Sequence, residues 1–168
     1  MAEIDSGRIG LLVALKKFTL EATSELIMPV RVQRKDEERT FRAADVYLMR
    51  LPDSKSPTKK APYILHQLIT AKDQQLPGKN VDSSALIRSV FCVYNEDEQE
   101  GGLMLLNLIE RLRIALMRQI VIDKRYKLLL NPAMEGLIYP EDNAPYFAGE
   151  MVSTWKIPAI EREVKGNL

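Results

Sequence analysis

His66 and Cys92 are the residues of this chain with chemistry suited to catalysis, because histidine is the usual general base and cysteine is a strong nucleophile. Each is the only residue of its type in the sequence. His66 lies in the middle of an apolar segment, and there is no second histidine with which it could share a metal ion. Cys92 lies in another apolar segment, where free cysteines are commonly small core residues. We therefore expect both residues to be structural.

Acidic residues gather immediately before a pair of glycines, which could indicate an ion site. A glycine pair that opens a helix can cradle an anion, but the preceding carboxylates would repel phosphate. The run also lacks the alternating ligand spacing of a calcium loop, so we expect a solvated turn. The segment comprises Glu96, Asp97, Glu98, Glu100, Gly101 and Gly102. Since no P-loop, dinucleotide-binding glycine motif or nucleophile elbow is present, we expect no enzyme activity, metal or cofactor.

The composition is ordinary for a soluble globular protein of 168 residues, with 46% apolar and 28% charged residues. The 24 basic side chains nearly cancel the 23 acidic ones, so the net charge of +1 gives no general attraction to nucleic acid or to an anionic membrane. No apolar run reaches the roughly 18 residues of a membrane helix. The N-terminus lacks the layout of a secretion signal. We expect one soluble domain, residues 1–168, made inside the cell.

Residues 101–123 are predicted to form the helix around which the chain is arranged. One stripe of apolar residues recurs at helical spacing and would face the core. The opposite face mixes polar and apolar residues, and a helix apolar nearly all round is covered on both sides or contacts another subunit. The stripe consists of Leu105, Leu108, Ile109, Leu112, Ala115, Leu116 and Ile120. The opposite face contains Leu103, Met104, Leu106, Asn107, Glu110, Arg111, Ile114, Met117, Arg118 and Val121.

The remaining pattern predicts an α+β fold. A first helix is expected from Asp5 or Ser6 to about Ile27, with its apolar residues on one side. Strand-like segments rich in β-branched and aromatic residues occur within 30–51 and at 63–70, 86–94, 126–130, 136–139 and 146–158. We expect the order α-β-β-β-α-β-β-β, with the two helices packed on one face of a mainly antiparallel sheet.

Two segments have the composition of exposed chain. Residues 52–62 are rich in Pro, Ser and Lys, and are predicted to form an exposed loop or an arm that orders on contact with a neighbour. Residues 161–168 are charged and are expected to form a flexible tail. In the strands 63–70 and 86–94, the residues that point to each face of the sheet are apolar. Both faces of these strands must therefore be covered by other parts of the protein or by a partner. Together with the mixed face of the 101–123 helix, the apolar faces of these strands favour a homo-oligomeric structural protein over a monomer covered by its own loops.

Several segments between residues 62 and 158 carry a family resemblance. They are a PYIL strand, a strand that ends in VYNEDEQEGG, the helix LLNLIERLRIAL, and LIYPEDNAPYFAGEMVSTWKIP with its aromatic–Gly–x–Met segment and terminal W-x-I-P. With these segments the chain resembles proteins of phages and prophages of Gram-positive bacteria that are encoded among the head–tail joining and tail genes. The family it is most similar to is that of tail-terminator, or tail-completion, proteins. Residues 30–60 match this family least.

The resemblance implies a small α+β subunit of a hexameric ring on the head-proximal end of the tail tube. Such a ring stops tail polymerisation, provides the surface to which the head docks and, in contractile tails, anchors the last sheath ring. The implied partners are further copies of the chain, the tail tube protein, the head–tail connector and the sheath protein, while DNA only passes through the lumen. The implied location is the virion tail, after assembly in the cytoplasm of the bacterial host.

A ring subunit needs a patch for each lateral neighbour and two axial surfaces. We expect the mixed face of the 101–123 helix to make the lateral contact. The acidic turn and the 52–62 loop would face axial partners or the lumen, where acidic residues would repel DNA. The candidate interface residues are Met104, Arg111, Ile114, Met117, Arg118, Glu96, Asp97, Glu98, Lys55, Lys59 and Lys60. The alternatives are a head–tail connector or stopper ring, and a small ligand-binding or enzymatic α+β domain with a pocket at His66 or Cys92.

Overall fold

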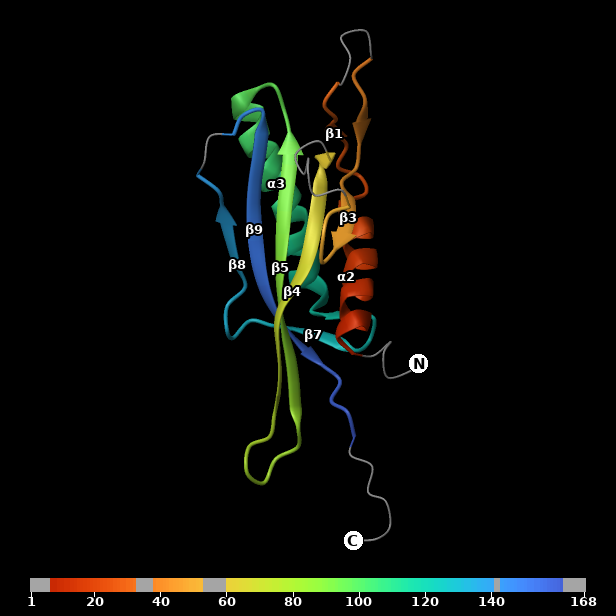
Figure 1. Cartoon of the computed structure of the whole chain (residues 1–168), viewed down its shortest axis with the longest axis vertical. Helices are drawn as coiled ribbons and strands as arrows, with labels where there is room; N and C mark the ends of the chain where they lie inside the picture. Colours follow the sequence, from red (N-terminus) through yellow and green to blue (C-terminus); the bar gives the residue numbers. More distant parts are fainter. Residues whose placement is uncertain (1–6, 33–37, 53–59, 141–142, 162–168) are drawn as a thin grey trace.

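The computed structural model describes residues 7–32, 38–52, 60–140 and 143–161. Across these residues the fold is α+β, with two helices and a mostly antiparallel, curled sheet (Figure 1). The strand order across the sheet is β3 (Asp45–Leu48), β4 (Tyr63–Gln74), β5 (Asp82–Tyr94), β9 (Tyr146–Ile157), β7 (Tyr126–Leu129) and β6 (Val121–Ile122). A further strand, β8 (Glu135–Ile138), pairs with β9 on the same edge as β7. Among the strands of the described residues, only β3 and β4 are parallel neighbours.

The order of elements differs from the expected α-β-β-β-α-β-β-β. In the described part of the chain, five strands lie between the helices and four follow the second helix. Two of the additional strands, β1 (Met28–Pro29) and β2 (Phe41–Arg42), pair with each other in a separate small sheet. Such two-residue strands are too short to carry a periodic sequence signal. The hairpin of β4 and β5 is also longer than expected, and its lower half extends beyond the helices (Figure 1).

The first helix, α2, spans Arg8–Thr23 and is shorter than predicted. Its N-cap is Gly7, which provides no side-chain cap, and Ser24 is its C-cap. The expected caps Asp5 and Ser6 lie outside the described residues. The helix was predicted to continue to about Ile27, but Met28 already belongs to β1 and a helix needs several residues to end before a strand begins.

The second helix, α3, spans Glu98–Gln119 and begins before the glycine pair that was expected to mark its start. Asp97 is its N-cap, and the side-chain carboxylate accepts hydrogen bonds from the backbone N–H groups of Gln99 (3.0 Å) and Glu100 (3.1 Å). These bonds satisfy donors that have no partner within the helix. The cap, and not the glycine pair, therefore decides where α3 begins.

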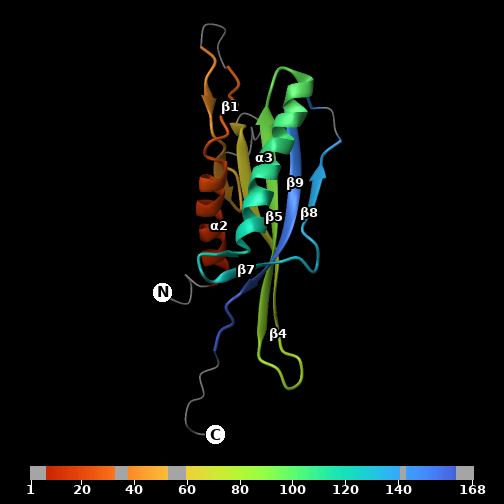
Figure 2. The same ribbon diagram turned by 180° about the vertical axis from the view of Figure 1, so that it is seen from behind.

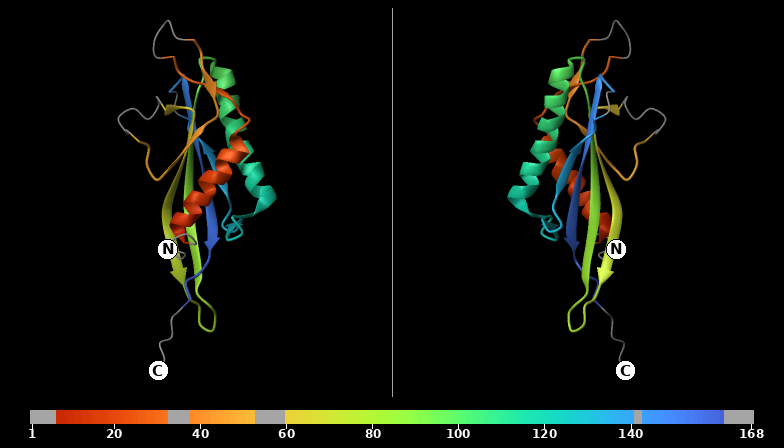
Figure 3. Two further views of the ribbon diagram at one scale, coloured as in Figure 1. Left: turned by 90° about the vertical axis from the view of Figure 1, so that its right-hand side faces the viewer. Right: turned by 90° about the vertical axis from the view of Figure 1, so that its left-hand side faces the viewer.

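The helices and the sheet enclose one main core. α2 packs against β3 and β4, whereas α3 packs against β5 and β9, and Figure 3 shows both helices on the same side of the sheet. The five large apolar residues of the predicted stripe on α3 are all buried in this core. They are Leu105, Leu108, Ile109, Leu112 and Leu116. On β9, the inward-facing residues Met151, Trp155 and Ile157 alternate with outward-facing ones, as period-two patterning requires.

A smaller core lies on the other face of the sheet, at the upper ends of β4 and β5. Its buried members are Ala61, Tyr63, Leu65, Cys92 and Tyr94. These residues alternate along the strands with those that face the helices, which explains why both strands read as apolar on both sides. Part of the second apolar face is therefore covered within one chain, while Ile69, further along β4, stays exposed.

Gly149 permits the close approach of α3 and β8 to β9. A Cβ atom at this position would lie 2.8 Å from the backbone oxygen of Leu137, and 3.3 Å from the Cδ1 atoms of Ile109 and Ile138. We expect Gly149→Ala to lower the free energy of unfolding by about 1–3 kcal/mol, because the backbone of β8 must move. Gly136→Ala is the matched control on β8, since its nearest neighbour would be 3.8 Å away. Urea denaturation of both variants checks this, and equal losses would contradict it.

Candidate functional site

His66 is a buried structural link between the first helix and the sheet. Its side chain is fully buried in β4, with Nε2 at 2.8 Å from Thr19 Oγ1 of α2 and Nδ1 at 2.7 Å from Ser89 Oγ of β5. Burial lowers the pKa of His66 to about 3. The ring is therefore neutral near pH 7, and each of its nitrogens has a hydroxyl partner that can donate or accept as the tautomer requires. In this position the ring is not exposed to solvent.

Cys92 is also buried, in the smaller core on the other face of the sheet. Burial raises the pKa of its thiol to about 11. Because the thiolate is the nucleophilic form, the thiol has little reactivity at neutral pH. His66 and Cys92 face opposite sides of the sheet, since His66 contacts α2 and Cys92 packs in the smaller core. The two residues therefore do not form a catalytic pair.

The acidic turn before α3 is partly used by the fold. Asp97 caps α3, and Glu96 pairs with Arg39 at 2.9 Å and accepts a hydrogen bond from the hydroxyl of Tyr94 at 3.0 Å. Glu98, in the first turn of α3, is exposed. Among the described residues, no three His, Cys, Asp or Glu side chains are grouped so that they could hold a metal ion. Of the three candidate residues in this turn, Glu98 is thus the one without a structural contact described here.

The side of α3 that faces away from the core carries an exposed apolar surface. Leu103, Leu106, Ile114 and Met117 are between 39% and 67% exposed. Their spacing of three, eight and three residues places them on one side of the helix. Glu110 lies between Leu106 and Ile114 and makes two hydrogen bonds of 2.7 Å with Arg113.

The edge strand β8 continues this surface. Ile138, which is 47% exposed, lies opposite Gly149 and faces α3, since its Cδ1 atom and that of Ile109 approach the same point above Gly149. Within the described residues, the outer edge of β8 has no strand partner. We call Leu103, Leu106, Ile114, Met117 and Ile138 the α3 face. Leu103, Leu106 and Ile138 were not among the candidate residues, although the first two are recognisable from their helical spacing.

Three other candidates on α3 lie elsewhere. Met104 is half-buried and lines a crevice of about 180 Å³ with β1 and β2. Arg111 is half-buried on the same flank as Met104, about two helical turns further along α3. Arg118 is exposed, but it lines a groove against Glu21 and Ala22 of α2. The structure thus brings Ile114 and Met117 together on the α3 face and places Met104, Arg111 and Arg118 outside it.

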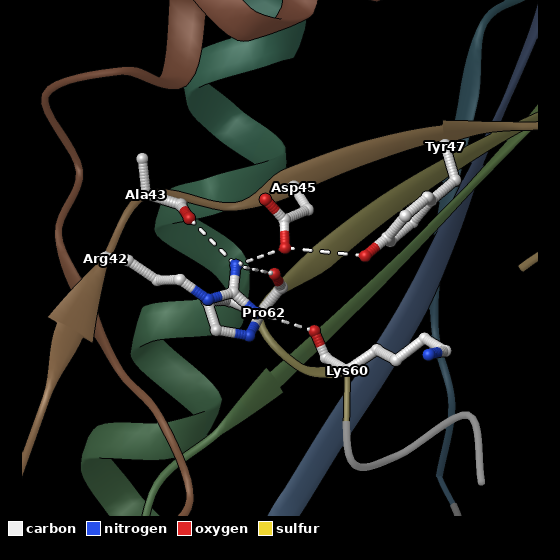
Figure 4. A network of polar contacts seen from close by, with 6 residues as sticks. All are labelled: Arg42, Ala43, Asp45, Tyr47, Lys60 and Pro62. Atoms are coloured by element: carbon white, nitrogen blue, oxygen red, sulfur yellow. Dashed lines mark hydrogen bonds and ion pairs between the residues drawn. The ribbon is translucent and has the colours of Figure 1, made fainter. Parts of the chain in front are cut away.

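Arg42 fixes the end of the predicted 52–62 loop to the body of the protein (Figure 4). Its guanidinium donates hydrogen bonds to the backbone oxygens of Lys60 (2.9 Å), Pro62 (3.0 Å) and Ala43 (3.1 Å), and pairs with Asp45 at 2.9 Å. Five donors in a rigid planar group suit this arrangement, which a lysine could not reproduce.

The predicted exposed loop is therefore not exposed over its whole length. Lys60 is half-buried, and Ala61 and Pro62 are buried because they pack at the start of β4 beside the smaller core. The candidates Lys55 and Lys59 lie outside the described residues, as do residues 162–168 of the predicted tail.

A groove of about 410 Å³ lies between α2 and the turn that follows α3. Its α2 side includes Ile9, Val13 and Phe18, and its opposite side includes Gln119 and Ile122. The lining mixes apolar residues with Lys17, Glu21, Asp123 and Arg125. Neither His66 nor Cys92 lines this groove. Its residues have no arrangement of nucleophile and base, so its shape suits the binding of apolar side chains better than catalysis.

Comparison with models of known protein families and with curated proteins found no match to this chain. Of the helices in the described residues, neither α2 nor α3 has the length and apolar content needed to cross a membrane. Inferences about function therefore depend on the structure of the chain itself. Its main feature is the exposed apolar α3 face beside the outer edge of β8, which pairs with no other strand of the described residues.

Proposed function

We propose that the protein is a structural subunit of a phage tail or phage-tail-like particle. In this proposal it forms a ring that caps the head-proximal end of the tail tube, stops polymerisation and offers the surface to which the head docks. The observation that carries the proposal is the α3 face, because large apolar residues on a regular helix mark a contact with another protein. The resemblance to tail-terminator proteins supports the choice of ring and location.

Burial of the α3 face in a contact would favour assembly. Burying one Leu, Ile or Met side chain contributes roughly 1.5–3 kcal/mol before the costs of ordering are subtracted. Ile114 and Met117 are already partly covered within the chain, so each gains less than the full value. Several such residues lie at each contact, and their contributions to the binding free energy add up. Each subunit of a closed ring makes two such contacts.

The axial surfaces of the ring would come from the acidic turn and from segments at the ends of the sheet. Glu98 is exposed at the start of α3, where acidic side chains facing the lumen would repel passing DNA. The hairpin of β4 and β5 extends from the opposite end of the molecule (Figure 1). A subunit with contact surfaces at its sides and at both ends has the layout that a ring between two other assemblies requires.

Electron microscopy of the purified protein, alone and mixed with purified tail tubes, tests this function. We expect closed rings alone, and rings at one end of each tube in the mixture. Tubes that keep growing in the presence of the protein would contradict a capping role. Binding to the portal side of heads but not to tails lacking heads would instead identify a connector or stopper.

A further inference from the structure

We propose that the lateral contact is made head to tail, with the α3 face of one subunit packed against a surface on α2 of the next copy. This inference rests on the proposed function, because it names the two surfaces from which the ring would be built. The second surface, here called the α2 face, consists of Ile9, Val13, Lys16, Lys17 and Leu20.

The α2 face is apolar at its centre and exposed. Ile9, Val13 and Leu20 are between 42% and 62% exposed. Their spacing of four and seven residues aligns them on the side of α2 away from the core, where a helix of a monomeric protein normally carries polar residues. The core side of α2 is filled by Leu11 and Leu15, which are buried. The outer stripe is therefore an apolar surface that the described residues of the chain leave uncovered.

Both faces are outer stripes of helices, but the α2 face also has a groove beside it. The α2 face borders the groove of about 410 Å³, to which Ile9 and Val13 contribute. The α3 face is the convex side of a helix, from which Leu103, Leu106 and Ile114 protrude into solvent. A protruding apolar stripe fits a groove better than it fits a copy of itself, because close packing requires complementary shapes.

The two faces lie toward opposite edges of the sheet. α2 packs on β3 and β4, whereas α3 packs on β5 and β9, with β8 beyond β9. Figure 2 accordingly shows α2 on one side of α3 and β8 on the other. Surfaces at opposite edges of one subunit are placed for a heterologous contact that repeats from copy to copy and closes as a ring. A symmetric dimer through either face would leave the other apolar surface exposed.

The charges on the two faces are complementary. Lys16 and Lys17 are exposed between Val13 and Leu20 on the α2 face. On the other side of the contact, Glu135 is exposed at the start of β8, whereas Glu110 within the α3 face is already paired with Arg113. Opposite charges at the rim of an apolar contact favour the correct register and disfavour the pairing of like faces.

The test uses two variants of the full chain, each with one altered face. Val13→Glu with Leu20→Glu alters the α2 face, and Ile114→Glu with Met117→Glu alters the α3 face. All four side chains are exposed, so the fold should be retained, which circular dichroism can verify. We expect each variant alone to have the mass of a single chain, 19.1 kDa for the parent sequence, when measured by sedimentation velocity.

Mixing the two variants gives the decisive measurement. Each retains one intact face, and these two faces are complementary, so the mixture should form a dimer of one copy of each and nothing larger. Leu76→Glu, at the exposed tip of the β4–β5 hairpin, is the matched control and should leave the ring unchanged. If the α2 variant fails to fold, Lys16→Glu with Lys17→Glu provides a second test and should weaken the ring at low salt.

Two results would overturn the inference while leaving the proposed function intact. One is an α2 variant, or the charge-reversal variant, that still forms rings of the parental mass and stability. The other is a dimer formed by either variant alone, which would show that a face pairs with itself. A parental protein that stays a single chain at high concentration would instead overturn the proposed function, and the inference with it.

Discussion

Replacing Ile114 and Met117 together by glutamate is expected to convert the assembled protein into single chains. Both side chains lie on the α3 face and are 39% exposed. The substitutions remove two apolar side chains from each contact and place two carboxylates in a desolvated surface. A loss of about 3 kcal/mol or more per contact raises its dissociation constant by more than a hundredfold. Sedimentation velocity at several concentrations measures the effect.

A loss of assembly in this variant can be distinguished from a loss of folding. Ile114 and Met117 do not belong to the buried stripe of α3, so urea denaturation of the variant should show a cooperative transition. Arg113→Ala is a useful neighbour, since it removes the ion pair with Glu110 without touching the apolar side chains. An exposed ion pair contributes only about 0–1 kcal/mol, so this variant should stay assembled. A double-glutamate variant of unchanged mass would exclude the α3 face as the contact.

Acid is expected to destabilise the protein through His66. Its pKa is lowered to about 3 in the folded state, compared with 6.5 for the free side chain. Between these values the unfolded chain binds a proton that the folded chain does not bind. The free energy of unfolding therefore falls as the pH is lowered from 6.5 toward 3, by up to roughly 1.4 kcal/mol per pH unit. At pH 4.5 the contribution of His66 to the loss is about 2–3 kcal/mol.

His66→Gln separates this effect from the titration of carboxyl groups. Glutamine does not titrate and can still form a hydrogen bond with Thr19 or Ser89, which partner the ring in the parent. Urea denaturation followed by the fluorescence of the buried Trp155, at one protein concentration and several pH values from 7 to 4.5, gives the slopes. The variant should be less stable at pH 7 but lose stability less steeply. Parallel slopes for the two proteins would disprove the assignment to His66.

Local sequence patterns were most informative for the long elements. The apolar stripe of α3 and the long strand at β9 were predicted correctly, because a long helix or strand has a recognisable period or composition. The predicted start of α3 was too late in the sequence, because the glycine pair was taken as the start of the helix whereas Asp97 supplies the N-cap. The strands β1 and β6 were missed because two residues form a strand only when a partner is brought to them.

For the candidate site, the sequence showed that α3 has more apolar residues than its core-facing side can hold. It did not show which of these residues share a surface. Met104 and Ile114 both lie off the core stripe, yet Met104 lines a crevice beside β1 and β2 whereas Ile114 is exposed. Neighbours from distant parts of the chain make this difference. The α2 face was not recognised, because α2 was predicted to have its apolar residues on one side and a solvent-exposed polar surface on the other. The contribution of Ile138 required the register of β8 against β9.

The sequence by itself determined the α+β class, the core stripe of α3 and the presence of the long strand β9, because hydrophobic periodicity and local composition are properties of each chain segment. The tertiary structure alone decided that Thr19, His66 and Ser89 meet, that Arg42 ties down the segment at Lys60, and that two apolar surfaces lie toward opposite edges of the sheet. These features depend on strand order and register, which bring together residues far apart in the sequence. Local spacing carries no information about such contacts.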